Sequence, residues 1–179
     1  MNPPAGAVPA GPARLRLFVA VWPPAGVVRQ LEELPRPARP GIRWTRPEQW
    51  HVTMRFLGHC ELEAAAEAFA ACTGEACTAV MGPATDRLGR GVLQVPVAGL
   101  GELAAAVVQA TAGVGRPPDS RPFHGHLTLA RARGARDLAD LVGQPAEATW
   151  PVTELTLVSS ITGRGGSRYG VERRLQLRS

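Results

Sequence analysis

Lysine is absent from this 179-residue sequence, and all 20 of its basic residues are arginine. Functions that need a lysine amine, such as P-loop phosphate binding, Schiff-base chemistry or covalent nucleotide ligation, are therefore excluded. Codon bias explains the missing lysine equally well, because Ala, Gly and Pro are also abundant. The net charge is nevertheless +5, which favours an anionic partner, and arginine binds phosphate in a bidentate manner.

Cysteine is also scarce. Cys60, Cys72 and Cys77 show no CxxC spacing, so we expect small buried side chains in a reducing cytoplasm rather than disulfides or a zinc knuckle. No apolar run reaches the ~20 residues that a membrane span needs, so no membrane partner is expected. Residues 1–13 lack the features of a signal sequence, and their Pro, Ala and Gly content predicts a disordered leader. One domain is expected over 14–179.

Hydrophobic periodicity predicts strands and helices that alternate along the chain. We expect strands at 14–22, 42–44, 49–58, 77–88, 91–97, 124–131, 151–160 and 168–177, and helices at 25–34, 61–76, 100–113 and 135–143. The second half of the chain repeats the order of elements in the first half. This pattern predicts an α+β fold with two similar lobes.

Two of the four histidines begin the same short motif. His51-Val-Thr53 and His126-Leu-Thr128 lie 126 − 51 = 75 residues apart, which is near half of the expected domain. Side chains alternate between the faces of a strand, so each histidine shares a face with its threonine while apolar residues occupy the other face. If the two strands are neighbours, two imidazoles and two hydroxyls meet around a volume the size of a phosphate group.

Such a group of side chains suits the opening of a cyclic phosphate. One imidazole takes a proton from water while the other protonates the departing oxygen, and the hydroxyls donate to the non-bridging oxygens. No metal is required. A single His-x-Thr motif carries little weight, and His124 and His126 share a face that offers a metal site as an alternative. However, no Asp or Glu lies close to either motif in the sequence.

The blocks HVTMRFLG at 51–58 and PFHGHLTLAR at 122–131 resemble the paired motifs of the two-histidine (2H) phosphoesterase superfamily. The resemblance is greatest to the RNA 2′,3′-cyclic phosphodiesterases, once described as 2′-5′ RNA ligases. It extends to the blocks RLFVAVWPP, IRWTRPEQW and ELTLVSS. It implies a bilobal, duplicated fold of two antiparallel β-sheets flanked by helices around a central groove. It also implies a monomer without cofactor that hydrolyses RNA 2′,3′-cyclic ends, or cyclic nucleotides, to 2′-phosphomonoesters.

The same resemblance gives roles to individual residues. His51 corresponds to the general acid and His126 to the general base, with Thr53 and Thr128 orienting the phosphate. Arg131 ends the second motif and is a candidate phosphate or ribose contact. In a regular strand it would face away from His126, so its role requires a bulge near Ala130.

Other candidate substrate contacts follow from parity and residue type. Arg55 is four residues after His51, so both side chains would lie on the same face of a regular strand. Aromatic rings can stack on a base. The remaining candidates are Phe18, Trp44 and Tyr169 for stacking, and His124 at the mouth of the groove, whereas His59 is expected in a surface turn.

Two other functions stay open from the sequence. The first is the reverse reaction, which joins 2′-phosphate or cyclic ends to a 5′-hydroxyl on the same residues. The second is a non-catalytic module that binds RNA or nucleotides in the groove. The presence of both histidines and both threonines favours catalysis.

Overall fold

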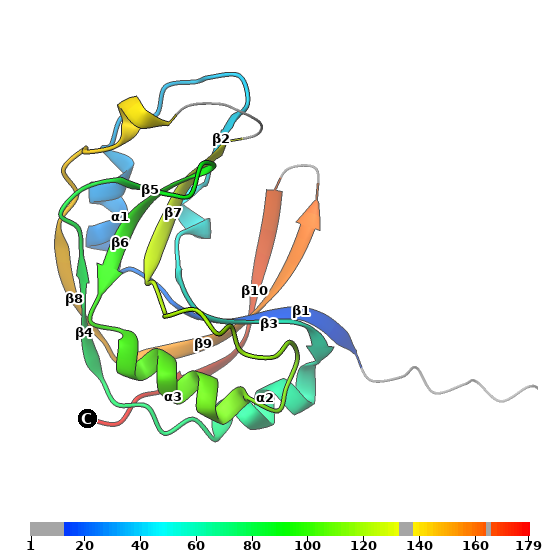
Figure 1. The fold of residues 1–179 in the computed structure, drawn as a ribbon. Coiled ribbons are helices and arrows are strands. Elements are labelled where there is room, and N and C mark those ends of the chain that lie inside the picture. The colour runs from blue at the N-terminus through cyan, green and yellow to red at the C-terminus, as the bar shows by residue number, and fades with distance from the viewer. Residues whose placement is uncertain (1–12, 133–137, 164–165) are drawn as a thin grey trace, which may run out of the picture.

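The computed structural model of the protein describes residues 13–132, 138–163 and 166–179 (Figure 1). The leader predicted at 1–13 therefore lies outside the described residues, apart from Ala13. The strands are β1 (Arg14–Val21), β2 (Ile42–Trp44), β3 (Val52–Glu61), β4 (Cys77–Met81), β5 (Asp86–Leu88), β6 (Val92–Ala98), β7 (His126–Ala132), β8 (Ala148–Val152), β9 (Glu154–Gly163) and β10 (Gly166–Gln176). The α-helices are α1 (Ala25–Glu32), α2 (Leu62–Ala70) and α3 (Gly101–Thr111), and the 3₁₀ turns are η1 (Pro47–Gln49) and η2 (Ala139–Leu141). The predicted α+β class is confirmed.

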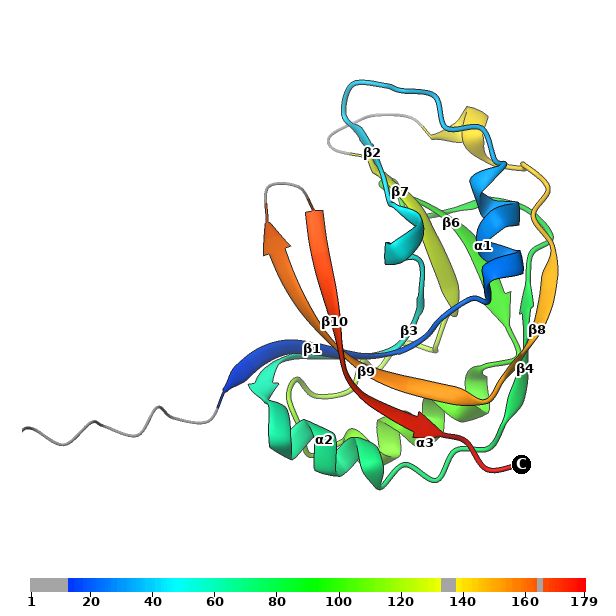
Figure 2. The same cartoon turned by 180° about the vertical axis from the view of Figure 1, so that it is seen from behind.

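The strands are joined along one curled, antiparallel path. Its order is β10-β9-β1-β3-β7-β6-β4-β8, with β2 beside β7 and β5 beside β6. The neighbours β3 and β7 are paired only at Val52↔Leu127. The sheet therefore consists of a half of four strands (β10, β9, β1 and β3) and a half of six (β7, β6, β4 and β8, with β2 and β5). One residue pair joins the two halves, and we call it the seam. The β9–β10 hairpin does not pair with β2 or β7, and its ribbon rises separately from theirs (Figures 1 and 2).

The two structural halves differ from the two halves of the sequence. The late strand β9 pairs with the early strand β1, so the first structural half is assembled from both ends of the domain. Helices α2 and α3 pack on each other and on β3, while α1 lies beside the second half (Figures 1 and 2). Among the described residues, no helix has the length and apolar character that a membrane crossing requires.

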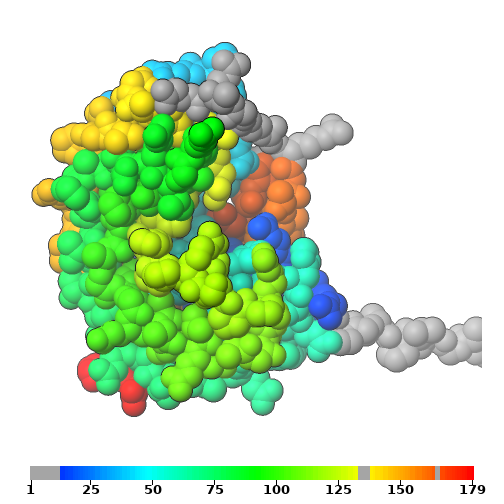
Figure 3. Space-filling model, in the orientation of Figure 1, coloured from blue at the N-terminus to red at the C-terminus, as the bar shows by residue number. Residues whose placement is uncertain are grey.

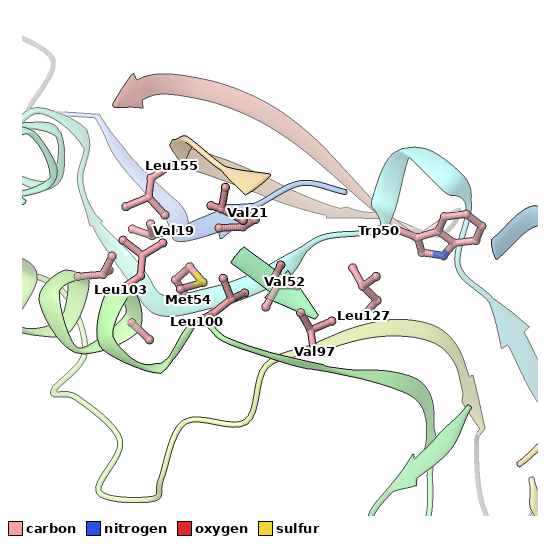
Figure 4. Packing of buried hydrophobic residues seen from close by; sticks show 14 of the residues in the cluster. Val19, Val21, Trp50, Val52, Met54, Val97, Leu100, Leu103, Leu127 and Leu155 are labelled. Atoms are coloured by element: carbon pink, nitrogen blue, oxygen red, sulfur yellow. The ribbon is translucent and has the colours of Figure 1, made fainter. Parts of the chain in front are cut away.

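A continuous hydrophobic core lies beneath both halves (Figure 4). The seam residues Val52 and Leu127 are completely buried in it, together with Met54 of β3 and Val97 of β6. Helix α3 adds Leu103 from its buried face. Because the apolar faces of both halves share this core, side-chain packing holds the halves together where strand pairing is sparse.

Three predicted elements differ in extent from the observed ones. The strand predicted at 49–58 begins only at Val52, because Pro47 starts the 3₁₀ turn η1 and fixes its backbone angle. The strand predicted at 77–88 is divided into β4 and β5. Gly82 lies between them with a φ of 118°, a backbone angle that glycine adopts without steric cost. The strand predicted at 151–160 is likewise two strands, β8 and β9.

The helices also differ from the expected ranges. The helix predicted at 61–76 ends at Ala70, and Gly74 in the following segment lowers the helix propensity there. The helix predicted at 135–143 is not present in its described part, where only η2 forms. Residues 133–137 lie outside the described residues.

Candidate active site

A pocket of about 480 Å³ opens between the two halves of the sheet. In Figure 3 the surface is hollowed between β7 (yellow-green) and the β9–β10 hairpin (orange). His51, immediately before β3, lines the pocket with Thr53, and His126 at the start of β7 lines it with Thr128. The seam pair lies between these residues, since each seam residue follows its histidine directly. The fold therefore brings the two motifs together.

The two histidines are held in the same way. His51 Nδ1 donates to the carbonyl oxygen of Gln49 at 2.8 Å, and His126 Nδ1 donates to that of His124 at 2.9 Å. In both cases the acceptor lies two residues before the histidine. A proton fixed on Nδ1 leaves Nε2 as the nitrogen that exchanges a proton with a ligand. Both rings are therefore oriented in the same way, through Nδ1.

His51 lies in an apolar surrounding. Its ring centroid is 4.7 Å from that of Phe18, 5.4 Å from that of Trp22 and 5.1 Å from that of Tyr169. Burial lowers the pKa of His51 from 6.5 to about 4, against the opposing effect of the Gln49 carbonyl. The nearby charges of His126 and Arg131 lower this pKa further. His51 is thus neutral at pH 7 in the unliganded protein, and it is electrostatically coupled to its partner.

A β-bulge follows the first motif. Thr53 pairs with Ala20 and Arg55 pairs with Val19, so Met54 is an extra residue in β3. The bulge reverses the parity of the strand. Phe56 consequently faces the pocket, five residues after His51.

The same bulge corrects the prediction that Arg55 contacts the substrate. Arg55 does not line the pocket and is only 6% exposed. Its guanidinium donates to Thr111 Oγ1 at 2.6 Å, and to the carbonyl oxygens of Val108 and Arg116 at 3.1 and 2.9 Å. Arg55 therefore connects β3 to the end of α3 and the segment beyond it.

A matching bulge follows the second motif. Thr128 pairs with Gln94 and Ala130 pairs with Leu93, so Leu129 is the extra residue in β7. Arg131 therefore turns toward the pocket, five residues after His126, as Phe56 does after His51. The Thr45 hydroxyl lies 2.7 and 2.8 Å from the carbonyl oxygens of Thr128 and Leu129 at this bulge. The bulge that the candidate role of Arg131 requires is present.

The other predicted contacts are divided between the pocket and its surroundings. Phe18 and Tyr169 line the pocket. His124 is not among the lining residues, and its backbone carbonyl orients His126 instead. Trp44 lies outside the lining and donates its Nε1–H to the Pro37 carbonyl at 3.0 Å. His59 is exposed, but it lies within β3 rather than in a turn.

Known proteins share both the sequence and the fold. The LigT-like phosphoesterase family model matches residues 21–80, which include the first motif. Escherichia coli LigT, solved with 3′-AMP, is 28% identical with a TM-score of 0.73, and the match covers 92% of this chain and 99% of that one. The chain is thus similar to the LigT-like phosphoesterases in part of its sequence and over most of its fold. Protein TT0787 of Thermus thermophilus is 27% identical with a TM-score of 0.72, and the match covers 92% of this chain and 98% of that one. No curated protein matches the sequence significantly.

Several residues in and around the pocket were missed by the sequence analysis. Arg16 lines the pocket, and Trp22 shields His51. Arg16 and Trp22 stand at alternating positions with Phe18, so the pattern of β1 already indicated that they lie on the same side of the strand as Phe18. Phe56 of β3 was also missed, because of the bulge at Met54. The remaining lining residues come from β2 and the residue after it, from η1 and from the β9–β10 hairpin, and their sequence offers no comparable pattern. They are Arg43, Thr45, Gln49, Ser160, Thr162 and Ser167.

The pocket has a marked charge asymmetry. Three arginines line it, and none of its lining residues is Asp or Glu. Arg16 lies over the Phe56 ring at 4.8 Å and donates to Thr162 Oγ1 at 3.1 Å. Within the described ranges, no three His, Cys, Asp or Glu side chains gather as metal ligands would. The lining therefore suits an anionic ligand.

Proposed function

We propose that this protein hydrolyses RNA 2′,3′-cyclic phosphate ends to 2′-phosphomonoesters by acid–base catalysis with His51 and His126. The observation that carries the proposal is the matched presentation of the two imidazoles, each fixed through Nδ1 on a backbone carbonyl and each lining one pocket. Both histidines come from one chain, which supports a monomeric enzyme.

The reaction needs one neutral and one protonated imidazole. The neutral ring takes a proton from water as the water oxygen bonds to phosphorus. The bond from phosphorus to O3′ breaks, and the protonated ring gives its proton to O3′. Thr53, Thr128 and Arg131 donate to the phosphoryl oxygens, on which negative charge grows in the transition state. The scheme requires no cofactor.

For the two roles we propose His51 as the acid and His126 as the base. A pKa of about 4 leaves His51 neutral in the unliganded pocket, so it must gain its proton together with the substrate. The negative charge of a bound cyclic phosphate favours the protonated form of a neighbouring imidazole. An imidazole that holds its proton weakly is also a strong proton donor.

Ligand-bound relatives support a nucleotide substrate. Structures of E. coli LigT include complexes with 3′-AMP and with NADP⁺, at 28% and 26% identity to this chain. We extend this binding to the present pocket, where Phe18 and Tyr169 supply aromatic surface and three arginines supply positive charge. A ribose 5′-hydroxyl that replaces water would bond to phosphorus in the same way while the bond from phosphorus to O3′ breaks, which forms a 2′–5′ linkage, so end-joining is a minor activity of the same site.

The proposal is tested with nucleoside 2′,3′-cyclic phosphates in the presence of excess EDTA. Hydrolysis to the 2′-phosphate should persist, and His51→Ala and His126→Ala should each lower kcat by about 10²- to 10⁴-fold. His59→Ala is the matched control because this histidine is exposed and outside the pocket. Retained activity in either pocket variant, or activity that EDTA abolishes, contradicts the mechanism. Formation of the 3′-phosphate would instead contradict the leaving group.

A further inference from the structure

Two guanidinium groups lie over the ring of Phe56. The Cζ atom of Arg16 is 4.8 Å from the centroid of this ring, and the Cζ atom of Arg116 is 5.9 Å from it. We call Arg16, Phe56 and Arg116 the Phe56 cluster. Arg16 and Phe56 line the pocket, whereas Arg116 lies beyond its lining and is exposed. The cluster therefore leads from the pocket to the surface of the protein.

Arg16 is held at the inner end of the cluster by β9. Its Nη1 donates to Thr162 Oγ1 at 3.1 Å, and Ser160 Oγ lies 3.5 Å from the same nitrogen. Two positions further along β1, Phe18 contacts the His51 ring, with 4.7 Å between the centroids. Arg16 is thus one alternation step, about 6.6 Å along the strand, beyond the neighbour of His51. None of the proton transfers or phosphoryl contacts proposed above involves Arg16.

The segment after α3 holds Arg116 at the outer end of the cluster. The backbone N–H of Arg116 donates to the Leu57 carbonyl at 2.8 Å, and its carbonyl oxygen accepts from Arg55 Nη2 at 2.9 Å. At Gly58, where φ is 73°, an added Cβ would come within 2.9 Å of Arg116 Cγ. Glycine therefore lets this side chain pass close to the backbone of β3 on its way to the ring. The backbone of Arg116 is fixed, while its guanidinium faces solvent.

The two positive charges of the Phe56 cluster are not neutralised by acidic side chains. Of the carboxylates in the described ranges, none forms an ion pair with Arg16 or Arg116. Asp119 follows Arg116 in the same segment, but both of its oxygens accept hydrogen bonds from Arg121. Both guanidiniums are therefore available to an anionic ligand.

Another edge of the pocket is bridged by contacts between distant segments. Gln49 Nε2, in η1, donates to the Ser167 carbonyl of β10 at 2.7 Å. Beside this bond, a Cβ added at Gly166 would come within 2.8 Å of Arg43 Nη1. A polynucleotide that extends beyond the reacting nucleotide is obstructed where η1 meets β10. The Phe56 cluster, in contrast, offers such a chain positive charge that continues outside the pocket.

We propose that the Phe56 cluster binds the RNA backbone on the 5′ side of the cyclic end. This inference rests on the proposed function, and it assigns to Arg16 and Arg116 the phosphates that precede the reacting nucleotide. Arginine forms strong charge-assisted hydrogen bonds with phosphate oxygens, and basic grooves with aromatic rings bind single strands. Contacts to the backbone do not depend on the bases. The enzyme accordingly prefers oligonucleotide ends of any sequence over mononucleotides.

Two substrates measure the contribution of the upstream backbone. They are adenosine 2′,3′-cyclic phosphate and the adenosine trinucleotide that ends in the same cyclic phosphate. In the wild type, the trinucleotide should have a kcat/KM about 10-fold or more above that of the mononucleotide. Arg116→Gln should reduce this ratio to about 3-fold or less, whereas Arg116→Lys, which keeps the charge, should retain most of it. Raising the salt concentration from about 50 to about 200 mM should lower the wild-type ratio by about 3-fold for each upstream phosphate contacted.

Arg168→Gln is the matched control for Arg116→Gln. Arg168 is also exposed, and it does not line the pocket although its neighbours Ser167 and Tyr169 do. The control should keep the wild-type ratio. An equal loss in Arg168→Gln and Arg116→Gln would show an effect of net charge alone and would overturn the site.

Binding measurements separate this test from the proposed reaction. Adenosine 3′-monophosphate and the adenosine trinucleotide with a 3′-phosphate are titrated calorimetrically into the wild type and into Arg116→Gln, with no turnover required. The wild type should bind the trinucleotide about 10-fold more tightly, and the variant should lose most of this difference. Failure to hydrolyse any cyclic substrate, with the binding difference intact, would count against the proposed reaction only.

Three further results would overturn the backbone site. The first is an equal affinity of the wild type for the two ligands. The second is a difference that survives in both Arg16→Gln and Arg116→Gln, because the upstream chain would then lie elsewhere. The third concerns the bases: exchanging the two upstream adenosines for uridines should change the ratio by less than about 3-fold. A larger change would show that bases, rather than the backbone, are recognised.

Discussion

The indole ring of Trp22 lies beside the imidazole of His51, with 5.4 Å between the ring centroids. Trp22 is anchored there because its Nε1–H donates to Thr156 Oγ1 at 2.8 Å. Trp22 therefore helps to keep water from His51, whose pKa burial lowers to about 4. We therefore expect the proton affinity of His51 to depend on Trp22, although Trp22 does not line the pocket.

Replacing Trp22 should make His51 more basic. In the wild type, the acid limb of kcat/KM should lie near pH 4, because the protonation state of His51 in the unliganded protein changes there. In Trp22→Leu, water reaches His51 and this limb should move toward the ordinary pKa of 6.5. The measurements are the pH profile of kcat/KM and the NMR titration of the His51 ring protons.

Trp44→Leu is the matched control for this prediction. Trp44 is also partly buried, and its Nε1–H is bonded to the Pro37 carbonyl rather than to a residue beside His51. Its replacement should leave the acid limb in place. An unchanged limb in Trp22→Leu, or an equal change in both variants, would show that Trp22 does not control the proton affinity of His51.

The lowered pKa of His51 also makes stability depend on pH. Between pH 6.5 and about 4, the unfolded imidazole binds a proton that the folded one does not, so the free energy of unfolding falls as the pH falls. The full contribution, about 3 kcal/mol, is present above pH 6.5 and is lost as the pH drops through about 4. Urea denaturation at pH 7 and pH 4 should show that His51→Gln loses less stability than the wild type. Equal losses would contradict this origin.

The acid and the base are distinguished by a substrate that needs no acid. When sulfur replaces O3′ in the cyclic phosphate, the leaving group departs as a thiolate without protonation. His51→Ala should then hydrolyse the sulfur substrate at a rate within about 10-fold of the wild type, while His126→Ala remains about 10²-fold or more impaired. The reverse order would exchange the two roles. Rescue of both variants, or of neither, would reject separate roles.

Arg55 and Arg131 should separate stability from activity. Arg55→Met removes a buried guanidinium that donates to Thr111 and to backbone carbonyls, so unfolding should become easier by about 2–4 kcal/mol. The folded variant should keep its kcat/KM, because Arg55 does not line the pocket. Arg131→Met should show the opposite pattern, with little change in stability and a loss of kcat/KM of about 10-fold or more. Urea denaturation and steady-state kinetics measure the two effects, and a similar pattern in both variants would refute the division.

The sequence predicted the fold class and the four motif residues of the pocket because alternation and the repeated His-x-Thr pattern are local signals. The two bulges are not local signals. The extra residues Met54 and Leu129 are apolar and buried like their neighbours, so the pattern conceals them. Regular alternation therefore predicted that Arg55 faces the pocket and that Arg131 faces away from it. In the structure Arg131 lines the pocket and Arg55 does not.

Other missed features depend on contacts between distant segments. Arg43 enters the pocket only because β2 pairs with β7, some 88 positions later in the chain (131 − 43). Trp22 reaches His51 because β1 lies next to β3. In the same way, no periodicity reveals that the carbonyls of Gln49 and His124 orient the two histidines. Geometry of this kind is set by tertiary pairing and not by residue type.

The placement of both histidines next to the single Val52↔Leu127 pair has a mechanical consequence. Any tilt of one half of the sheet against the other would turn about this point. Displacement in such a rotation grows with distance from the pivot, so the tip of the β9–β10 hairpin would move further than the two imidazoles. Widening the entrance for a bulky nucleic acid terminus would therefore break the hydrogen bond from Gln49 to the Ser167 carbonyl, while the spacing of the two imidazoles would change little.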